Sequence, residues 1–286
     1  MTERKSAWRL LLANPVTVVS GALLVVIAVV AVSANWIVPY GVNDVDVPDA
    51  LQPPSGAHWF GTDELGRDVF SRVLVAIQAS MRVAVVSVAF AVVVGVTVGV
   101  VAGYRGGWLD TVVMRVVDVM FAFPVLLLAL AVVAILGPGV TTTILAIGIV
   151  YTPIFARVAR ASTLSVRVEP FVSVSRSMGT GDLYILRRHI LPNIAGPLVV
   201  QTSLSLAFAI LSEAALSFLG LGIQPPQPSL GRMIFDSQGF VTLAWWMAVF
   251  PGAAIFVAVL AFNLLGDGLR DVLDPKQRTM IEARSK

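Results

Sequence analysis

Long apolar runs alternate with short polar segments along the whole chain. Five stretches contain no Asp, Glu, Lys, Arg or His: residues 10–43, 83–104, 119–156, 190–212 and 237–266. A helix needs about 20 apolar residues to cross the hydrocarbon core of a bilayer, and each stretch is long enough. Helices satisfy their own backbone hydrogen bonds without water, so they are the expected spanning elements.

The third apolar run is too long for one crossing, and Gly137-Pro138-Gly139 divides it into parts of two helices. The pattern therefore predicts an all-α, polytopic membrane protein. Its six helices are expected near 15–37, 81–103, 112–136, 140–161, 194–216 and 242–265. The predicted organisation is a segment 1–78 with the N-terminal tail, first helix and outer loop, a five-helix core 79–267 that includes a polar loop 162–192, and a C-terminal tail 268–286.

Composition supports a membrane protein and sets its orientation. Hydrophobic residues make up 57% of the chain and charged residues 13%, which excludes a soluble globule. Of the 20 Lys and Arg residues, 16 fall on the side of the two termini, the second loop and the fourth loop. The excess of basic residues on cytoplasmic loops predicts that both termini are cytoplasmic. Because topology accounts for these residues, no nucleic-acid partner is expected.

The N-terminal apolar stretch has an alternative interpretation as a secretory signal, because it ends in the small residues Ala31-Val32-Ser33-Ala34. The apolar part of such signals usually has about 7–15 residues, and this one is longer. A retained spanning helix is therefore favoured.

Several kinds of chemistry are not expected, because the sequence lacks the residues that they require. No Lys follows a glycine, so the chain has no P-loop, and ATP hydrolysis is not expected in it. With no cysteine and only His58 and His189 on opposite sides, a metal site is not expected either. No catalytic cluster is visible, so the chain is predicted to be neither an enzyme nor a cofactor-binding protein. The apolar runs also lack the ionisable residues expected of a secondary transporter.

One polar island stands out within the fourth loop, VSVSRSMGTGDLYILRRHILPN at 172–193. Pro170 suits the first position of a helix, Gly179 suits a left-handed turn and Asp182 suits the next helix N-cap. Pro192 opposes continuation of a helix from Leu191. The island is therefore predicted to form a helix, a tight corner and a second short helix.

The first of these helices carries an apolar stripe outside the membrane. Phe171, Val174 and Met178 occupy positions i, i+3 and i+7, on one helical face. From periodicity alone, two interpretations stay open. The stripe lies on lipid headgroups or on the protein's own helix ends, or it docks a soluble partner.

The spacing of Gly179, eleven residues and then Leu191-Pro192 resembles the cytoplasmic loop signature of ABC importer permeases. Ser173-Val174-Ser175 stands where that signature has Glu-Ala-Ala, and His189 replaces its isoleucine. The resemblance implies that residues 169–189 form the coupling helices that contact an ATPase subunit. The implied coupling residues are Glu169, Phe171, Val174, Ser175, Arg176, Met178, Gly179, Asp182, Leu183, Arg187, His189, Leu191 and Pro192.

Three longer strings resemble the C-type permease of dipeptide, oligopeptide and nickel importers: residues 58–74, 187–193 and 213–234. The resemblance implies a type I ABC importer transmembrane domain in the cytoplasmic membrane, forming half of a pathway for peptides. The implied partners are a homologous B-type permease, one or two ATPase subunits that bind ATP and Mg, and an extracytoplasmic binding protein. Nickel-chelate or haem-like cargo is the alternative, and a secondary transporter is less favoured.

Two outer segments have predicted roles of their own. The charges of the outer loop are expected to pair with each other or to contact another subunit, and the residues concerned are Gly61, Thr62, Asp63, Gly66, Arg67 and Asp68. Pro225, Pro226 and Pro228 are expected to stop the fifth helix and form a rigid outer cap. Glu213 nearby is expected to pack against an arginine or to line the pathway.

Inside the membrane, Gly95, Gly99 and Gly103 recur every four residues and predict close approach of another helix. Pro124, Pro153 and Pro251 are candidate kinks. Arg115 and Asp118 are expected to pair with each other at i and i+3.

Overall fold

The computed structural model describes residues 15–273. The long helices are α2 (Pro15–Ile37), α3 (Val69–Arg105), α6 (Val140–Val166), α9 (Leu191–Phe218) and α11 (Trp246–Leu273). Between α3 and α6 lie α4 (Gly107–Phe121) and α5 (Val125–Leu136). Within these residues, five helices are long and apolar enough to cross a membrane, or six if the bent α4–α5 pair counts as one span. The prediction of an all-α polytopic protein is confirmed.

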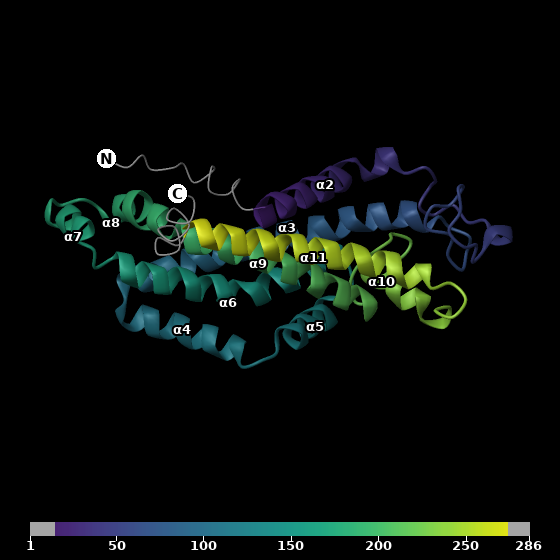
Figure 1. The fold of residues 1–286 in the computed structure, drawn as a ribbon. Helices are drawn as coiled ribbons and strands as arrows, with labels where there is room; N and C mark the ends of the chain where they lie inside the picture. The colour runs from purple at the N-terminus through teal and green to yellow at the C-terminus, as the bar shows by residue number, and fades with distance from the viewer. Residues whose placement is uncertain (1–14, 274–286) are drawn as a thin grey trace.

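The helices form an elongated bundle with a distinct end on each side (Figure 1). The short helices α7 (Pro170–Ser177) and α8 (Asp182–Ile185) form one end, called here the α7 end. The loop before α3, with the 3-10 turn Val47–Asp49, lies at the opposite end with α10 (Leu230–Asp236) and the 3-10 turn Ser237–Gly239. This second end is called the α10 end.

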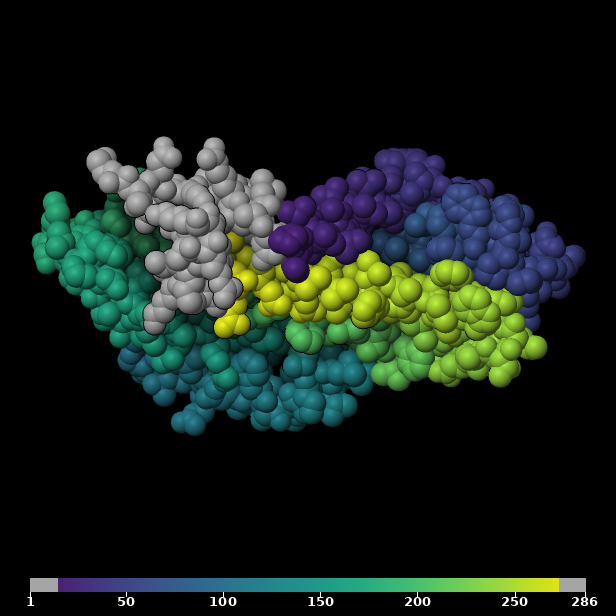
Figure 2. All heavy atoms as spheres, viewed as in Figure 1, coloured from purple at the N-terminus to yellow at the C-terminus, as the bar shows by residue number. Residues whose placement is uncertain are grey.

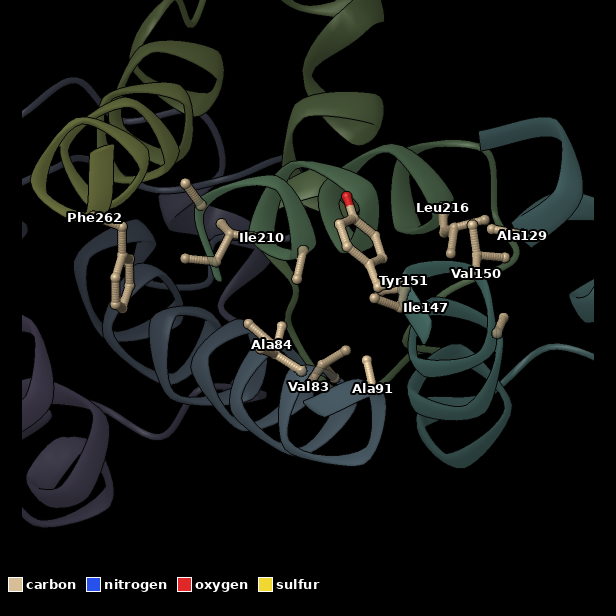
Figure 3. Packing of buried hydrophobic residues seen from close by; sticks show 14 of the residues in the cluster. Val83, Ala84, Ala91, Ala129, Ile147, Val150, Tyr151, Ile210, Leu216 and Phe262 are labelled. Atoms are coloured by element: carbon tan, nitrogen blue, oxygen red, sulfur yellow. The ribbon is translucent and has the colours of Figure 1, made fainter. Parts of the chain in front are cut away.

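The core is built where α3, α6, α9 and α11 meet, and α2 lies along the outside against α11 and α3 (Figure 2). Small and β-branched side chains dominate this contact, and Tyr151 is among its few large members (Figure 3). The side chains labelled there are Val83, Ala84 and Ala91 of α3, Ala129 of α5, Ile147, Val150 and Tyr151 of α6, Ile210 and Leu216 of α9, and Phe262 of α11. Small residues allow the helix backbones to approach closely.

The predicted glycine stripe is confirmed as the contact between α3 and α6. A methyl group added at Gly95 would lie 2.5 Å from the carbonyl oxygen of Thr152, and one added at Gly103 would lie 3.0 Å from that of Arg160. A methyl group at Gly99 would overlap the backbone carbonyl of Ala156. Any side chain at these positions would push the two helices apart.

The helix predicted over 112–136 is divided into two helices at Pro124, one of the predicted kinks. The chain is broken between Phe121 and Val125, and α4 and α5 meet at a bend of 92°. Pro124 explains the break, because a proline disfavours helical conformation in the residue before it and offers no backbone N–H. By contrast, α6 and α11 continue through Pro153 and Pro251 without interruption.

The second helix begins at Val69, twelve residues before its predicted start. Its N-terminus is fixed by Asp68, whose carboxylate accepts a hydrogen bond from the backbone N–H of Ser71. The extra turns carry Ser71 and Arg72, which are buried within the protein at the α10 end, so this part of the helix did not need an apolar sequence.

Candidate functional site: the corner between α7 and α8

The corner at the α7 end has the predicted course of helix, turn and helix. Pro170 is the first residue of α7, and Gly179 has a φ of +81°, as expected. Asp182, however, is not the N-cap of α8, because Gly181 occupies that position and Asp182 begins the helix. The carboxylate of Asp182 is therefore free for a contact with another element.

The predicted end of the second helix before Pro192 is wrong. Residues Leu186–Ile190 form a π-helical turn that joins α8 directly to α9. Pro192 then lies in the first turn of α9, where a missing backbone N–H costs little. Residues Asp182–Phe218 consequently form one apolar helix, so the corner and the fifth spanning helix are a single element.

An apolar stripe on the inner side attaches the corner to the bundle. Val172 of α7 and Ile185 of α8 are completely buried. They belong to a cluster with Val100 and Tyr104 of α3 and with Ala159 of α6. Val172 was not among the predicted residues, although an apolar residue directly beside the outer stripe of α7 was a signal.

A polar contact adds to this attachment. The hydroxyl of Tyr104 donates a hydrogen bond of 2.8 Å to Oδ1 of Asp182. The guanidinium carbon of Arg176 lies 5.3 Å from the centre of the Tyr104 ring. The interaction with Tyr104 raises the pKa of Arg176, so this side chain stays charged. Tyr104 was not among the predicted residues, because nothing in the sequence relates it to a loop so far along the chain.

The outer face of the corner is apolar and exposed. Phe171, Val174 and Met178 are 42%, 59% and 80% exposed, and Leu183 is 62% exposed. No element within residues 15–273 covers them, so the interpretation in which the chain's own helix ends cover the stripe is wrong. Such a face outside the spanning helices is typical of a contact surface.

The remaining side chains of the corner divide into two groups. Leu183, Tyr184, Arg187 and Arg188 line a shallow groove of about 370 Å³. His189 instead lies between the two helices, with Nε2 at 3.3 Å from Oγ of Ser175 and its ring 5.8 Å from that of Phe171. The groove leaves Arg187 and Arg188 available to a partner, whereas His189 and Ser175 hold α7 to the π-helical turn. Glu169 precedes α7 without a side-chain cap, and Leu191 is half-exposed.

The charges of the loop at the α10 end pair with each other, as one of the two predictions stated. Arg67 contacts Asp63 at 2.7 Å and Glu64 at 3.1 Å, and Arg72 lies 3.5 Å from Asp63. Burial raises the pKa of Glu64, and the nearby Asp63 carboxylate raises it further. This network fixes the loop shape.

The remaining predicted residues of this loop fix its backbone. Gly61 and Gly66 have φ values of +74° and +75°, which other residues adopt with strain. Thr62 accepts a hydrogen bond from Nε1 of Trp246 at its carbonyl oxygen, at 3.0 Å. Asp68, besides capping α3, lies 2.9 Å from Nδ1 of His58. The loop is thereby joined to α11 and α3.

Glu213 has no arginine partner within residues 15–273. Its side chain is completely buried and accepts hydrogen bonds from Ser80 of α3 at 2.5 Å and from Ser217 at 2.7 Å. The predicted arginine partner of Glu213 is therefore wrong, and Glu213 joins α9 to α3 through hydroxyl groups. Beyond it, α9 ends at Phe218, and the prolines at 225, 226 and 228 lie in the connection to α10, as expected.

The predicted pair of Arg115 and Asp118 is not formed. Asp118 pairs with Arg157 of α6 at 2.7 Å, and Asp110 holds Arg160 through two contacts of 2.5 and 2.6 Å. Because α4 lies against α6, the carboxylates of α4 pair with arginines of α6 and not with Arg115 of their own helix. Among the described residues, no group of three or more His, Asp or Glu side chains is arranged to hold a metal ion.

Comparisons with known proteins agree with this geometry. Residues 95–279 match the family model "Binding-protein-dependent transport system inner membrane component", and residues 2–54 match "N-terminal TM domain of oligopeptide transport permease C". The chain is 47% identical to the glutathione transport system permease protein GsiD of Escherichia coli O6:K15:H31 over 94% of this chain and 89% of the relative. It is 43% identical to GsiD of Pectobacterium atrosepticum over 97% and 93%.

Among solved structures, the fold is similar to an inward-facing conformation of the MetNI methionine ABC transporter. The TM-score is 0.58 at 20% identity, over 70% of this chain and 94% of that one. An amino acid ABC transporter crystallised with histidines gives a TM-score of 0.53 at 16% identity. At these identities the likeness concerns the fold alone.

Proposed function

The chain belongs to the family of binding-protein-dependent transport system inner membrane components, and we propose that it forms half of the transmembrane pathway of an ATP-driven importer of small peptides. Permeases of this family are transport components rather than enzymes. ATP and Mg are accordingly assigned to partner subunits, and this chain supplies the pathway and the contact that drives it.

One observation supports this function above the others: the corner between α7 and α8 combines an exposed apolar face with a rigid attachment. Phe171, Val174 and Met178 point away from the bundle, while Val172 and Ile185 are buried in it. A surface that only covered lipid would not need two independent attachments to the spanning helices. A surface that passes a movement on to the spanning helices does need such attachments.

The corner can pass such a displacement to two spanning helices. It reaches α9 through the π-helical turn Leu186–Ile190, and it reaches α3 through the hydrogen bond between Tyr104 and Asp182. The glycine contacts then connect α3 to α6. When partner ATPases close on ATP, movement of the corner tilts these helices and changes which side of the bundle is open.

The orientation follows from this role. The α7 end faces the cytosol, where the ATPase subunits are, and the distribution of Lys and Arg supports the same placement. The α10 end then faces the extracytoplasmic side, where its buried network of charges gives a binding protein a rigid surface. A homologous permease supplies the other half of the pathway.

A small peptide is the substrate best supported by the relatives. Both are named glutathione transport permeases, and glutathione is a tripeptide. The N-terminal region also matches a segment named for oligopeptide transport. The proposed cargo is therefore a short peptide, and the binding protein rather than this chain is expected to provide most of the affinity.

Reconstitution tests the proposal. The full chain is co-purified with its associated subunits, placed in proteoliposomes with the binding protein, and supplied with labelled glutathione or a dipeptide. Peptide uptake that requires both ATP and the binding protein is the expected result. Uptake driven by an ion gradient without ATP, or co-purification without any nucleotide-binding subunit, would contradict the proposal.

A further inference from the structure

A cavity between α2 and α3 is lined by an arginine that pairs with no other residue in the part of the chain that the structure describes. Arg82 is exposed on α3 and makes no ion pair with any of the residues 15–273. It lines a cavity of about 830 Å³ whose walls come from α2, α3, the loops before α3 and α10, and the first residue of α6. A charged group on a spanning helix is costly unless an opposite charge or polar surroundings compensate it. An anion in the cavity would do so.

The polar side chains of this cavity wall lie toward one end, among apolar neighbours such as Val75 and Ala79, and the other end is aliphatic only. α2 runs toward the α10 end and α3 runs away from it, so Asn35 and Gln78 lie nearer that end than Arg82 does (Figure 1). Asn43 and Gln227 line the same end. Beyond Arg82 the lining consists of aliphatic side chains, namely Ala28, Val85, Val86 and Val140. The cavity thus fits an amphipathic ligand with an anionic head.

The level of Arg82 matches the edge of the hydrocarbon core. It directly precedes the charge-free run 83–104, and it shares the cavity with Val140, the first residue of α6. On the same helix α2, Val25 and Val29 are exposed, and so is Val32, which lines the cavity. A lipid can enter from this apolar flank with its headgroup already at the right depth.

We propose that this cavity binds a membrane phospholipid, with the phosphate at Arg82 and an acyl chain against Val85 and Val86. A transported peptide is a poorer fit, because its backbone is polar along its length and the wall beyond Arg82 offers no side-chain hydrogen-bonding group. The hydrogen bond from Gln78 to the carbonyl of Ala31, at 2.7 Å, holds α2 and α3 together at the cavity. A bound lipid would extend this contact between the first helix and the core.

Native mass spectrometry tests the proposal on the full chain, purified with its associated subunits and titrated with dioleoylphosphatidylglycerol. Arg82→Gln is expected to weaken the tightest lipid-binding step by about fivefold, since one basic contact is lost. Arg82→Lys keeps the charge and should retain most of the affinity. Ala28→Phe fills the aliphatic part and should also weaken this step. Arg115→Gln, at an exposed arginine of α4, is the matched control and should bind lipid as the wild type does.

Three results would overturn the proposed lipid site. Wild-type lipid affinity in both Arg82→Gln and Ala28→Phe would overturn the proposal. Displacement of the lipid by glutathione would assign the cavity to the substrate instead. Crosslinking of a Val32→Cys variant to a second permease subunit would assign it to a protein contact, which also overturns a lipid site.

Discussion

The hydroxyl of Tyr104, in the last turn of α3, donates a hydrogen bond of 2.8 Å to Oδ1 of Asp182, the first residue of α8. These residues are 78 positions apart in the chain. Together with apolar packing and the guanidinium of Arg176 over the Tyr104 ring, this bond links the corner to the helix that carries the glycine contacts. It therefore occupies the point where movement of the corner would enter the core.

Tyr104→Phe removes this hydrogen bond and leaves the ring in place. A hydrogen bond to a charged group contributes about 1.5–3 kcal/mol, so the corner should move partly independently of α3. We expect the peptide transported per ATP hydrolysed to fall about tenfold, with ATPase activity maintained. The ratio of the two rates in proteoliposomes measures this. Tyr40→Phe, which loses the hydrogen bond from the Tyr40 hydroxyl to the carbonyl of Ala57 at the α10 end, is the matched control, and an equal loss in that variant would contradict the role of Tyr104.

Substitution of Gly179 tests whether transport depends on the backbone conformation of the corner. Its φ of +81° favours glycine, and a methyl group there would meet no atom within 4 Å, so the effect of Gly179→Ala is one of backbone strain alone. A left-handed conformation costs an alanine about 1–2 kcal/mol. Transport should fall while membrane insertion is unchanged, and Gly179→Asn should be milder. Gly181→Ala, also uncrowded but without a positive φ, should transport normally. Normal uptake in Gly179→Ala would contradict this account of the corner.

Gly99 tests the contact between α3 and α6. A methyl group in Gly99→Ala would overlap the backbone of Ala156, and a backbone cannot rotate away as a side chain can. Overpacking of this kind costs about 1–3 kcal/mol. The melting temperature, followed by tryptophan fluorescence in detergent, should fall. Gly252→Ala in α11 has open space and should keep or raise the melting temperature, because alanine favours a helix more than glycine does. Equal shifts in the two variants would contradict a close helix contact.

Substitution of Glu213 tests the hydrogen bonds by which its carboxylate joins α9 to α3. Glu213→Leu would leave the hydroxyls of Ser80 and Ser217 without their acceptor in a completely buried place. We expect it to destabilise the protein by about 1–3 kcal/mol, and Glu213→Gln, which keeps an acceptor oxygen, to cost clearly less. Thermal unfolding distinguishes them. Equal melting temperatures for Glu213→Leu and Glu213→Gln would contradict a stabilising role of these hydrogen bonds.

The spanning helices were largely predictable, because the bilayer demands apolar runs of a known length. The first helix was predicted to end at Ile37, and it ends there. A kink at Pro124 was predictable from the proline itself, but the size of the bend, 92°, was not, because it depends on how α4 packs against α6. The early start of α3 was missed because its first turns are buried in protein and not in lipid.

The candidate site was predictable in outline, and its connections were not. Pro170 and Gly179 each impose a local backbone geometry, so their roles could be read from the sequence. The π-helical turn has no comparable signal, because it depends on how α8 meets α9. Tyr104 and Arg157 were also missed as partners, since the choice of partner for Asp182 and Asp118 is decided by the packing of helices far apart in the chain.

Because the chain contains no cysteine, a single introduced cysteine reports on one position without background. Val174→Cys places the thiol on the exposed face of α7, and Val241→Cys, at an exposed residue of the α10 end, is its control. The measurement is labelling by a membrane-impermeant maleimide from each side, followed by crosslinking from position 174. We expect Val174→Cys to be labelled only from the cytosolic side and to crosslink to a nucleotide-binding subunit, with Val241→Cys labelled from the opposite side. Labelling of Val174→Cys from outside intact cells, or crosslinking that never captures a nucleotide-binding subunit, would contradict the account.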